Sequence, residues 1–130
     1  MKPKYRISFW FEWGGECFWA ADEKTQEKYD IPIDPEKLPL SPETVARARE
    51  LGAWHDTSLN WASPLDPGPW RQEECDRFNA AVKELFEVVS AELGDEFDVT
   101  NDHHEINEHP DFDEYWRDHD LDAYLARRRR

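Results

Sequence analysis

Two groups of side chains in this sequence have the types and the spacing to do chemistry. The first is His55-Asp56, which shares a segment with Trp54, Trp61 and Trp70. A histidine beside an acid can act in general acid–base catalysis, and tryptophan rings can form an aromatic slot for a ligand. The structural alternative is that the tryptophans pack this segment onto the core. Neighbours on an extended chain point in opposite directions, so His55 and Asp56 are not expected to form a catalytic pair.

The second group is the acidic C-terminal segment, which contains His103, His104 and His109. Its spacing differs from HExxH, because His104 and His109 would lie about 140° apart on a helix. A calcium loop that starts at Asp118 is excluded by Ala123, which stands where such loops need glycine. We therefore expect no metal site and no cofactor, and we interpret the segment as a solvated acidic surface.

No residue of the chain is predicted to be catalytic. Cys75 falls on an apolar stripe, where thiols are usually inert, and Glu16 beside Cys17 would raise the pKa of that thiol. The sequence has no phosphate loop, nucleophile elbow or dinucleotide fingerprint. It thus offers no positive sign of an enzyme. Two separate cysteines and the absence of a signal peptide predict a cytoplasmic protein.

The charge balance limits the possible partners. The 130 residues carry 30 acids and 16 bases, a formal net charge of −14. Binding nucleic acid or an anionic membrane surface requires cationic side chains, so both are unlikely partners. No apolar run approaches the roughly 20 residues of a membrane helix. A basic protein remains a suitable partner, and the oligomeric state is left open.

Hydrophobic spacing predicts the elements that position these residues. Residues 5–13 alternate with period two, and Gly14-Gly15 and residues 16–21 complete a β-hairpin. Residues 72–93 carry apolar side chains at helical spacing and end at Gly94. Residues 96–100 are expected to form a third strand.

The remaining segments are harder to assign. Ser41-Pro42 begins a helix that should run to about Leu51, with Gly52 as its stop. Residues 53–71 then form a long loop rich in Trp and Pro, a kind of loop that is often functional. A final helix is expected from about 112 to 125. The arginines at 127–130 are interpreted as offsetting the neighbouring acids.

Together these elements predict an α+β fold. We expect a short antiparallel sheet with an N-terminal β-hairpin, packed against one long helix, plus one or two shorter helices. Residues 1–101 should form a single domain. Residues 102–130 should form an acidic, His-rich segment that is partly helical and is packed on the domain or extends from it.

The segment from Trp54 to Trp61, followed by Asp66-Pro67-Gly68-Pro69-Trp70, resembles a pattern in small bacterial proteins of no established activity. Those proteins also begin with a Tyr-x-Ile-x-Phe-Trp-Phe-like strand and a Gly-Gly turn, as residues 5–15 do here. The resemblance covers roughly residues 4–100. It implies a bacterial origin and no particular chemistry.

Three functions are compatible with these observations. The first is an acidic protein-binding module, an immunity or antitoxin-like inhibitor of a basic bacterial partner. The second is a small-ligand binder or enzyme that uses the Trp54–Trp70 loop around His55. The third is a housekeeping module with no specific partner. The candidate binding residues are Trp54, His55, Asp56, Trp61, Trp70, Asp111, Asp113 and Glu114.

Overall fold

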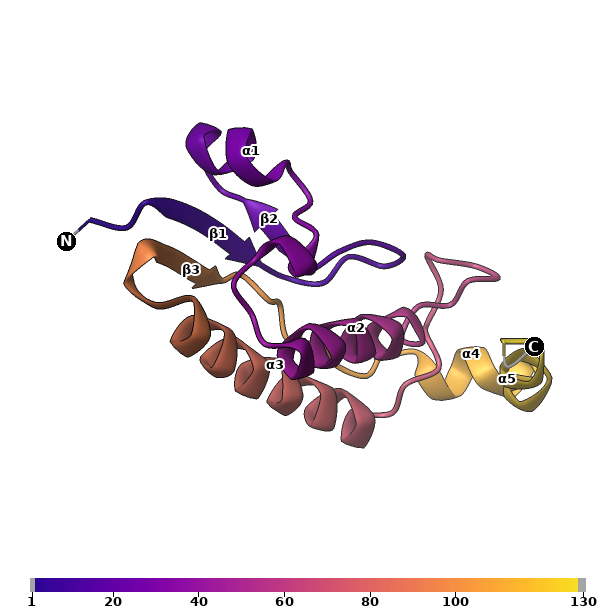
Figure 1. The fold of residues 1–130 in the computed structure, drawn as a ribbon. Coiled ribbons are helices and arrows are strands. Elements are labelled where there is room, and N and C mark those ends of the chain that lie inside the picture. The colour runs from indigo at the N-terminus through magenta and orange to yellow at the C-terminus, as the bar shows by residue number, and fades with distance from the viewer. Residues whose placement is uncertain (1, 129–130) are drawn as a thin grey trace.

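The computed structural model describes residues 2–128, and these form an α+β fold (Figure 1). A small sheet of strand order β2-β1-β3 packs against helices α2 and α3, which lie side by side. The class predicted from the sequence is confirmed: an N-terminal hairpin packs on one long helix. The strands are β1 (Tyr5–Phe9), β2 (Phe18–Ala20) and β3 (Phe97–Asn101), and the helices are α1 (Glu23–Tyr29), α2 (Pro42–Asp56), α3 (Gln72–Leu93), α4 (Phe112–Asp118) and α5 (Leu121–Arg128).

The hairpin forms with a wider turn than predicted. Strand β1 pairs antiparallel with β2, and Phe9 lies opposite Phe18. The chain reverses over residues 12–15, where the Gly15 N–H donates to the Glu12 carbonyl at 3.1 Å and Gly14 takes a positive φ of 72°. Trp13 therefore lies in the turn. It is 46% exposed, whereas Phe9 and Phe11, which share its position in the alternation, are buried.

The third strand makes the sheet mixed, whereas an antiparallel sheet was predicted. Strand β3 pairs parallel with β1 and places Val99 opposite Ile7. Helix α3 carries the chain back along the sheet before β3 begins, and parallel pairs require such a crossover. Sequence patterns predict a strand but not its direction when no tight turn precedes it.

Helix α3 forms where its apolar spacing predicts. The 22-residue helix buries Cys75, Phe78, Val82, Leu85, Val89 and Leu93. Gly94 caps it with a positive φ of 69°. This stripe packs against Ile7, Phe9 and Phe18 of the sheet in one hydrophobic core. The core therefore lies between the sheet and α3.

Helix α2 extends past its predicted end. Ser41 caps it as expected, and its side chain accepts a hydrogen bond from the Thr44 N–H. The helix then continues through Gly52 to Asp56, so Trp54, His55 and Asp56 lie on its last turn and not in a loop. A glycine inside a helix costs about 1 kcal/mol relative to alanine. Burial of the aromatic side chains on the last turn of α2 stabilises the helix by more than this cost. The loop starts only at Thr57.

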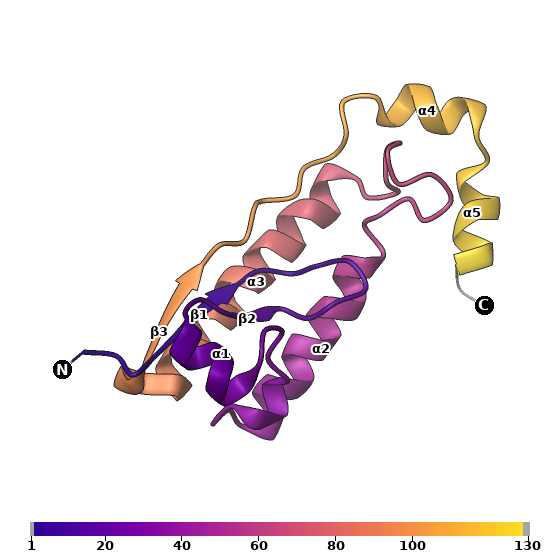
Figure 2. The same ribbon diagram turned by 90° about the horizontal axis from the view of Figure 1, so that it is seen from above.

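The C-terminal segment runs along α3 and reaches the opposite end of the molecule from β3 (Figure 2). The single helix predicted for 112–125 is two helices, because the Asp120 side chain accepts a hydrogen bond from the Ala123 N–H and starts α5 anew. The last two arginines, at 129–130, lie outside the described residues. No helix among residues 2–128 has the length and apolarity needed to cross a bilayer.

Candidate functional site

The predicted site residues Trp54, His55 and Trp70 come together around one ring of α3, Phe78. The ring centroid of Phe78 lies 5.2 Å from Trp54, 5.6 Å from His55 and 5.2 Å from Trp70. The Trp54 indole N–H donates to Glu74 at 2.9 Å, and that of Trp70 donates to Thr57 at 2.9 Å. This aromatic cluster therefore packs the last turn of α2, through Trp54 and His55, and the end of the 57–71 loop, through Trp70, onto α3.

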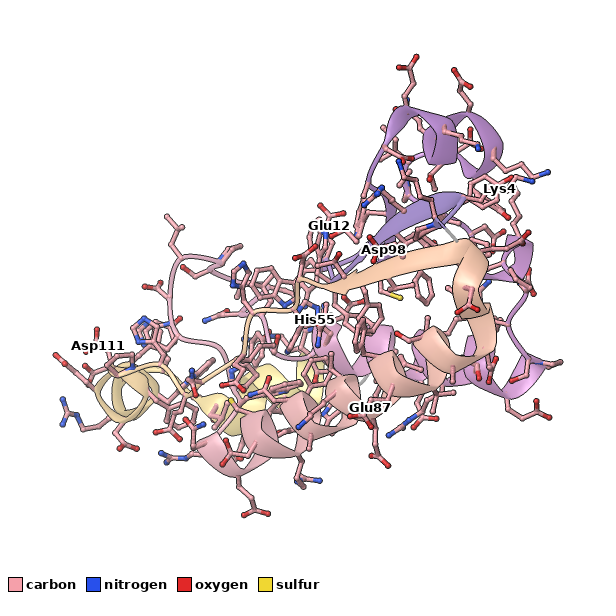
Figure 3. All side chains as sticks on the ribbon, turned by 90° about the vertical axis from the view of Figure 1, so that its left-hand side faces the viewer. Lys4, Glu12, His55, Glu87, Asp98 and Asp111 are labelled. Carbon is pink, nitrogen blue, oxygen red and sulfur yellow. The ribbon has the colours of Figure 1, made fainter. Side chains whose placement is uncertain are left out.

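His55 lies in the interior of the molecule (Figure 3) and is only 5% exposed. Its imidazole stacks on Trp13, with ring centroids 5.1 Å apart and planes 13° apart. Burial lowers the pKa of His55 to about 4, and the nearby Asp56 only partly opposes this shift. His55 is thus neutral near pH 7. Its Nδ1 atom has no hydrogen-bond partner among the described residues.

Asp56 does not orient His55. Its carboxylate accepts a hydrogen bond from the Gly14 N–H at 2.8 Å and so holds the hairpin turn. His55 and Asp56 lie on a helix and not on the extended chain that was expected. They contact different residues, since His55 stacks on Trp13 and Asp56 accepts a hydrogen bond from Gly14. The pair therefore lacks the base–orienter contact that acid–base catalysis uses.

Trp61 lies apart from the cluster around Phe78. Its indole N–H donates to the Asp56 carbonyl at 2.6 Å, and the guanidinium of Arg128 lies 5.2 Å from its ring centroid. The ring is 37% exposed. Trp61 and Trp13 are thus both partly open to solvent and both contact residues at the end of α2, through Asp56 and His55.

The C-terminal helices hold the 57–71 loop in place. The Tyr124 hydroxyl donates to the Leu59 carbonyl at 3.0 Å and accepts from the Trp61 N–H at 3.0 Å. The fully buried Asn60 donates to the Pro67 carbonyl at 3.2 Å and to the Tyr115 hydroxyl at 3.1 Å. These partners satisfy loop groups that would otherwise be buried without hydrogen bonds.

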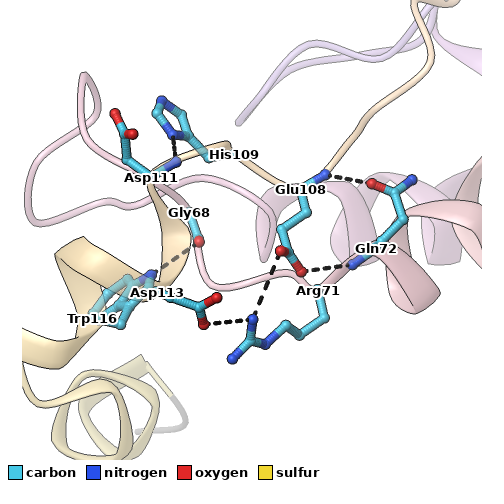
Figure 4. Close-up of polar contacts among 8 residues, drawn as sticks. All are labelled: Gly68, Arg71, Gln72, Glu108, His109, Asp111, Asp113 and Trp116. Atoms are coloured by element: carbon cyan, nitrogen blue, oxygen red, sulfur yellow. Dashed lines mark hydrogen bonds and ion pairs between the residues drawn. The ribbon is translucent and has the colours of Figure 1, made fainter.

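The predicted acidic residues Asp111, Asp113 and Glu114 lie at the surface, at the start of α4. Asp111 is at the surface, well separated from His55 (Figure 3). Asp113 pairs with Arg71 at 2.9 Å, and the Trp116 indole N–H donates to the Gly68 carbonyl at 3.1 Å (Figure 4). Glu114 is exposed on α4. The structure thus separates the predicted residues into a buried aromatic cluster and an exposed acidic face.

A cavity of about 680 Å³ lies beside His55 and Trp13. We call it the aromatic cavity. The hairpin, the end of α2, the 57–71 loop and residues 103–110 all contribute to its walls. Trp10 and Trp13 were not predicted as site residues, and His103 was considered only as a candidate metal ligand of the acidic segment. The only sequence signal for this cavity was the tryptophan-rich hairpin. The other walls come from distant segments, and their contact with the hairpin is a property of the tertiary structure. Its lining includes Trp10, Trp13, His55, Asp66, Trp70 and Glu105.

The described residues contain no group of three or more His, Cys, Asp and Glu side chains that could hold a metal ion. His103 is tied to Asn79, with Nε2 and Oδ1 3.1 Å apart, and burial lowers its pKa. Burial also raises the pKa of Cys75 to about 11 and that of Cys17 further still. Neither thiol is therefore prepared to act as a thiolate nucleophile.

Two comparisons with known proteins bear on this arrangement. No curated protein matches the chain. A family model described as Serratia CdiI immunity protein-like matches residues 5–103, from β1 to just past β3. The match includes the hairpin, both core helices and the whole 57–71 loop, whereas α4 and α5 lie beyond it. The chain therefore belongs to the Serratia CdiI immunity protein-like family.

Proposed function

We propose that this protein binds a bacterial toxin whose contacting surface is basic and thereby inhibits it. Family membership supports an immunity-protein-like inhibitory role. The observation that carries the rest is the combination of exposed apolar side chains and carboxylates at one end of the molecule. The residues lie on the hairpin turn, the 57–71 loop and the start of α4, which are toward the same end of the molecule (Figure 1). We call this region the loop–tail surface, and its exposed residues are Trp13, Trp61, Leu65, Asp111, Asp113 and Glu114.

The apolar members of this surface are suited to anchor a partner. Trp13 and Trp61 are partly exposed, and Leu65 at the tip of the loop is 98% exposed. Both tryptophans are held in place by indole hydrogen bonds, Trp13 to Ser58 at 2.8 Å and Trp61 to the Asp56 carbonyl. Ordered tryptophans lose little entropy on binding and are enriched among interface residues that dominate affinity.

The carboxylates of this surface are suited to steer a basic partner. The chain carries a net charge of −14, and Asp111, Asp113 and Glu114 are all exposed. Charges of this kind accelerate diffusional encounter with an oppositely charged protein, and salt screens the effect over about 8 Å at physiological ionic strength. We place this binding in the cytoplasm, where Cys17 and Cys75 would remain the free thiols that the structure has.

The test is binding kinetics, at low and high salt, against a toxin identified among the products of the genes adjacent to this one. Asp111→Asn, Asp113→Asn and Glu114→Gln together should lower the on-rate about tenfold at low salt and change the off-rate much less. The matched control removes three exposed charges elsewhere, through Glu27→Gln, Glu84→Gln and Glu87→Gln. A toxin that fails to bind rejects the function. An on-rate independent of salt rejects electrostatic steering by a basic partner.

A further inference from the structure

The aromatic cavity is large enough to receive part of a partner protein. Its volume is about 680 Å³. Pockets of about 300–1,000 Å³ bury most of a small ligand, so this cavity can hold a long side chain with some adjoining backbone. Its walls come from segments that are far apart in the sequence, so the folded chain is needed to build it.

The tryptophans in its walls are rigidly supported. Trp10 stacks on Trp19 with ring centroids 4.5 Å apart, and Trp13 stacks on His55 at 5.1 Å. Trp70 is buried and adds a third indole. Tryptophan is the ring that attracts a cation most strongly, and the planar guanidinium of arginine also stacks on it.

The charges around the cavity favour a cation. Within the described residues its lining includes Asp66 and Glu105 but no lysine or arginine. The histidine nearest the stacked indole, His55, is neutral near pH 7 because burial lowers its pKa to about 4. A positively charged side chain would therefore meet the carboxylates of Asp66 and Glu105 and the neutral ring of His55, without a lysine or arginine in the lining to compete with it.

His55 itself is not explained by packing alone. It is 5% exposed, and its Nδ1 lacks a hydrogen-bond partner among the described residues. An unsatisfied buried nitrogen costs stability, and an apolar side chain would fill the same space without that cost. A polar group kept at the cavity wall is typical of a binding site.

We propose that the aromatic cavity binds an arginine side chain of the toxin partner. The methylene stem lies along the apolar wall, the guanidinium stacks on the exposed indole of Trp13, and Asp66 and Glu105 compensate its charge. A purely apolar side chain would leave these carboxylates without a counter-charge. The occupant rests on the proposed function, but the chemistry of the cavity can be tested without the toxin.

The test is a titration of the full chain with N-acetyl-arginine amide, followed by NMR of the indole N–H signals. The matched probe is N-acetyl-citrulline amide, which has nearly the same shape and no charge. The signals of Trp10 and Trp13 should shift saturably with the arginine probe, and the citrulline probe should bind about tenfold more weakly. Equal binding of the two probes, or no saturable shift, would overturn the proposal.

Variants test whether the arginine probe binds in the aromatic cavity. Asp66→Asn with Glu105→Gln should weaken the arginine probe and leave the citrulline probe unchanged, and both changes affect exposed side chains. The control Glu27→Gln with Glu84→Gln removes two exposed charges outside the cavity and should change neither. Shifts confined to α4 and α5 would also overturn the proposal. If the toxin binds but the arginine probe does not, the inference fails and the proposed function stands. If the probe binds but the toxin does not, the function and the toxin as occupant are both rejected, and only the preference of the cavity for arginine stands.

Discussion

The indole of Trp13 lies flat on the imidazole of His55, with ring centroids 5.1 Å apart and planes 13° apart. Next to this stack, the Trp13 indole N–H donates to Ser58 at 2.8 Å and the Gly14 N–H donates to Asp56 at 2.8 Å. The hairpin turn is thereby fastened to the end of α2. One wall of the aromatic cavity consequently depends on two elements that are separate in the sequence.

Burial of His55 should make the protein less stable in mild acid. Its pKa is about 4 in the folded protein and near 6.5 when unfolded, so between these values only the unfolded chain takes up the proton. Stability should therefore be complete above about pH 6.5 and fall as the pH approaches 4, by up to about 3 kcal/mol.

The measurement is the melting temperature in steps from pH 7 to pH 4. His55→Phe removes this titrating group and should reduce the fall in stability, while the part due to His103, whose pKa is also lowered by burial, remains. Val88→Ala, at a 45% exposed site on α3, should leave the shape of the profile unchanged. A constant difference between wild type and His55→Phe at all pH values would contradict the assignment.

Two glycines should respond to alanine in opposite ways. A Cβ at Gly52 would meet only the Phe11 ring, at 4.0 Å, within helix α2. Gly52→Ala should therefore stabilise the protein by about 0.5–1 kcal/mol. A Cβ at Gly68 would lie 2.0 Å from the Ser58 carbonyl oxygen, so Gly68→Ala should destabilise it by about 1–3 kcal/mol. Urea unfolding measures both, and changes of the same sign would refute the local geometry.

Loss of the Phe78 ring should destabilise the domain by a large fraction of its total stability. Phe78 is fully buried and contacts the rings of Trp54, His55 and Trp70. Phe78→Ala should cost about 3–5 kcal/mol, against a total stability of about 5–15 kcal/mol. Val88→Ala, at a 45% exposed site on the same helix, should cost far less. Similar unfolding midpoints for the two variants would show that α3 does not face the core as described.

The Tyr124 hydroxyl should be needed to order the 57–71 loop. Tyr124→Phe leaves the Leu59 carbonyl and the Trp61 N–H without this partner, which should cost about 1–3 kcal/mol. Tyr29→Phe removes the same atom from a half-buried ring of α1 and serves as the control. Hydrogen exchange should show faster exchange at Trp61 in Tyr124→Phe only. Unchanged exchange there would mean that α5 does not hold the loop.

Local sequence determined those elements whose signals lie within a few neighbouring residues. The apolar spacing of α3, its end at Gly94 and the cap at Ser41 all follow from the geometry of a helical turn. The alternation of residues 5–9 likewise specifies a strand with one buried face. In each case the residues that carry the signal are also the residues that form the structure.

Tertiary packing decided the rest. Helix α2 continues through Gly52 because Trp54 and His55 gain more by packing on Phe78 than the glycine costs. Trp13 does not join the buried Phe9 and Phe11, because Asp56 and Ser58 hold the hairpin turn against the end of α2. These outcomes depend on contacts between residues far apart in the chain. A local sequence pattern does not report how strongly such contacts stabilise the fold. The aromatic cavity is built from such contacts, and for that reason the sequence showed its tryptophans without showing that they share a site.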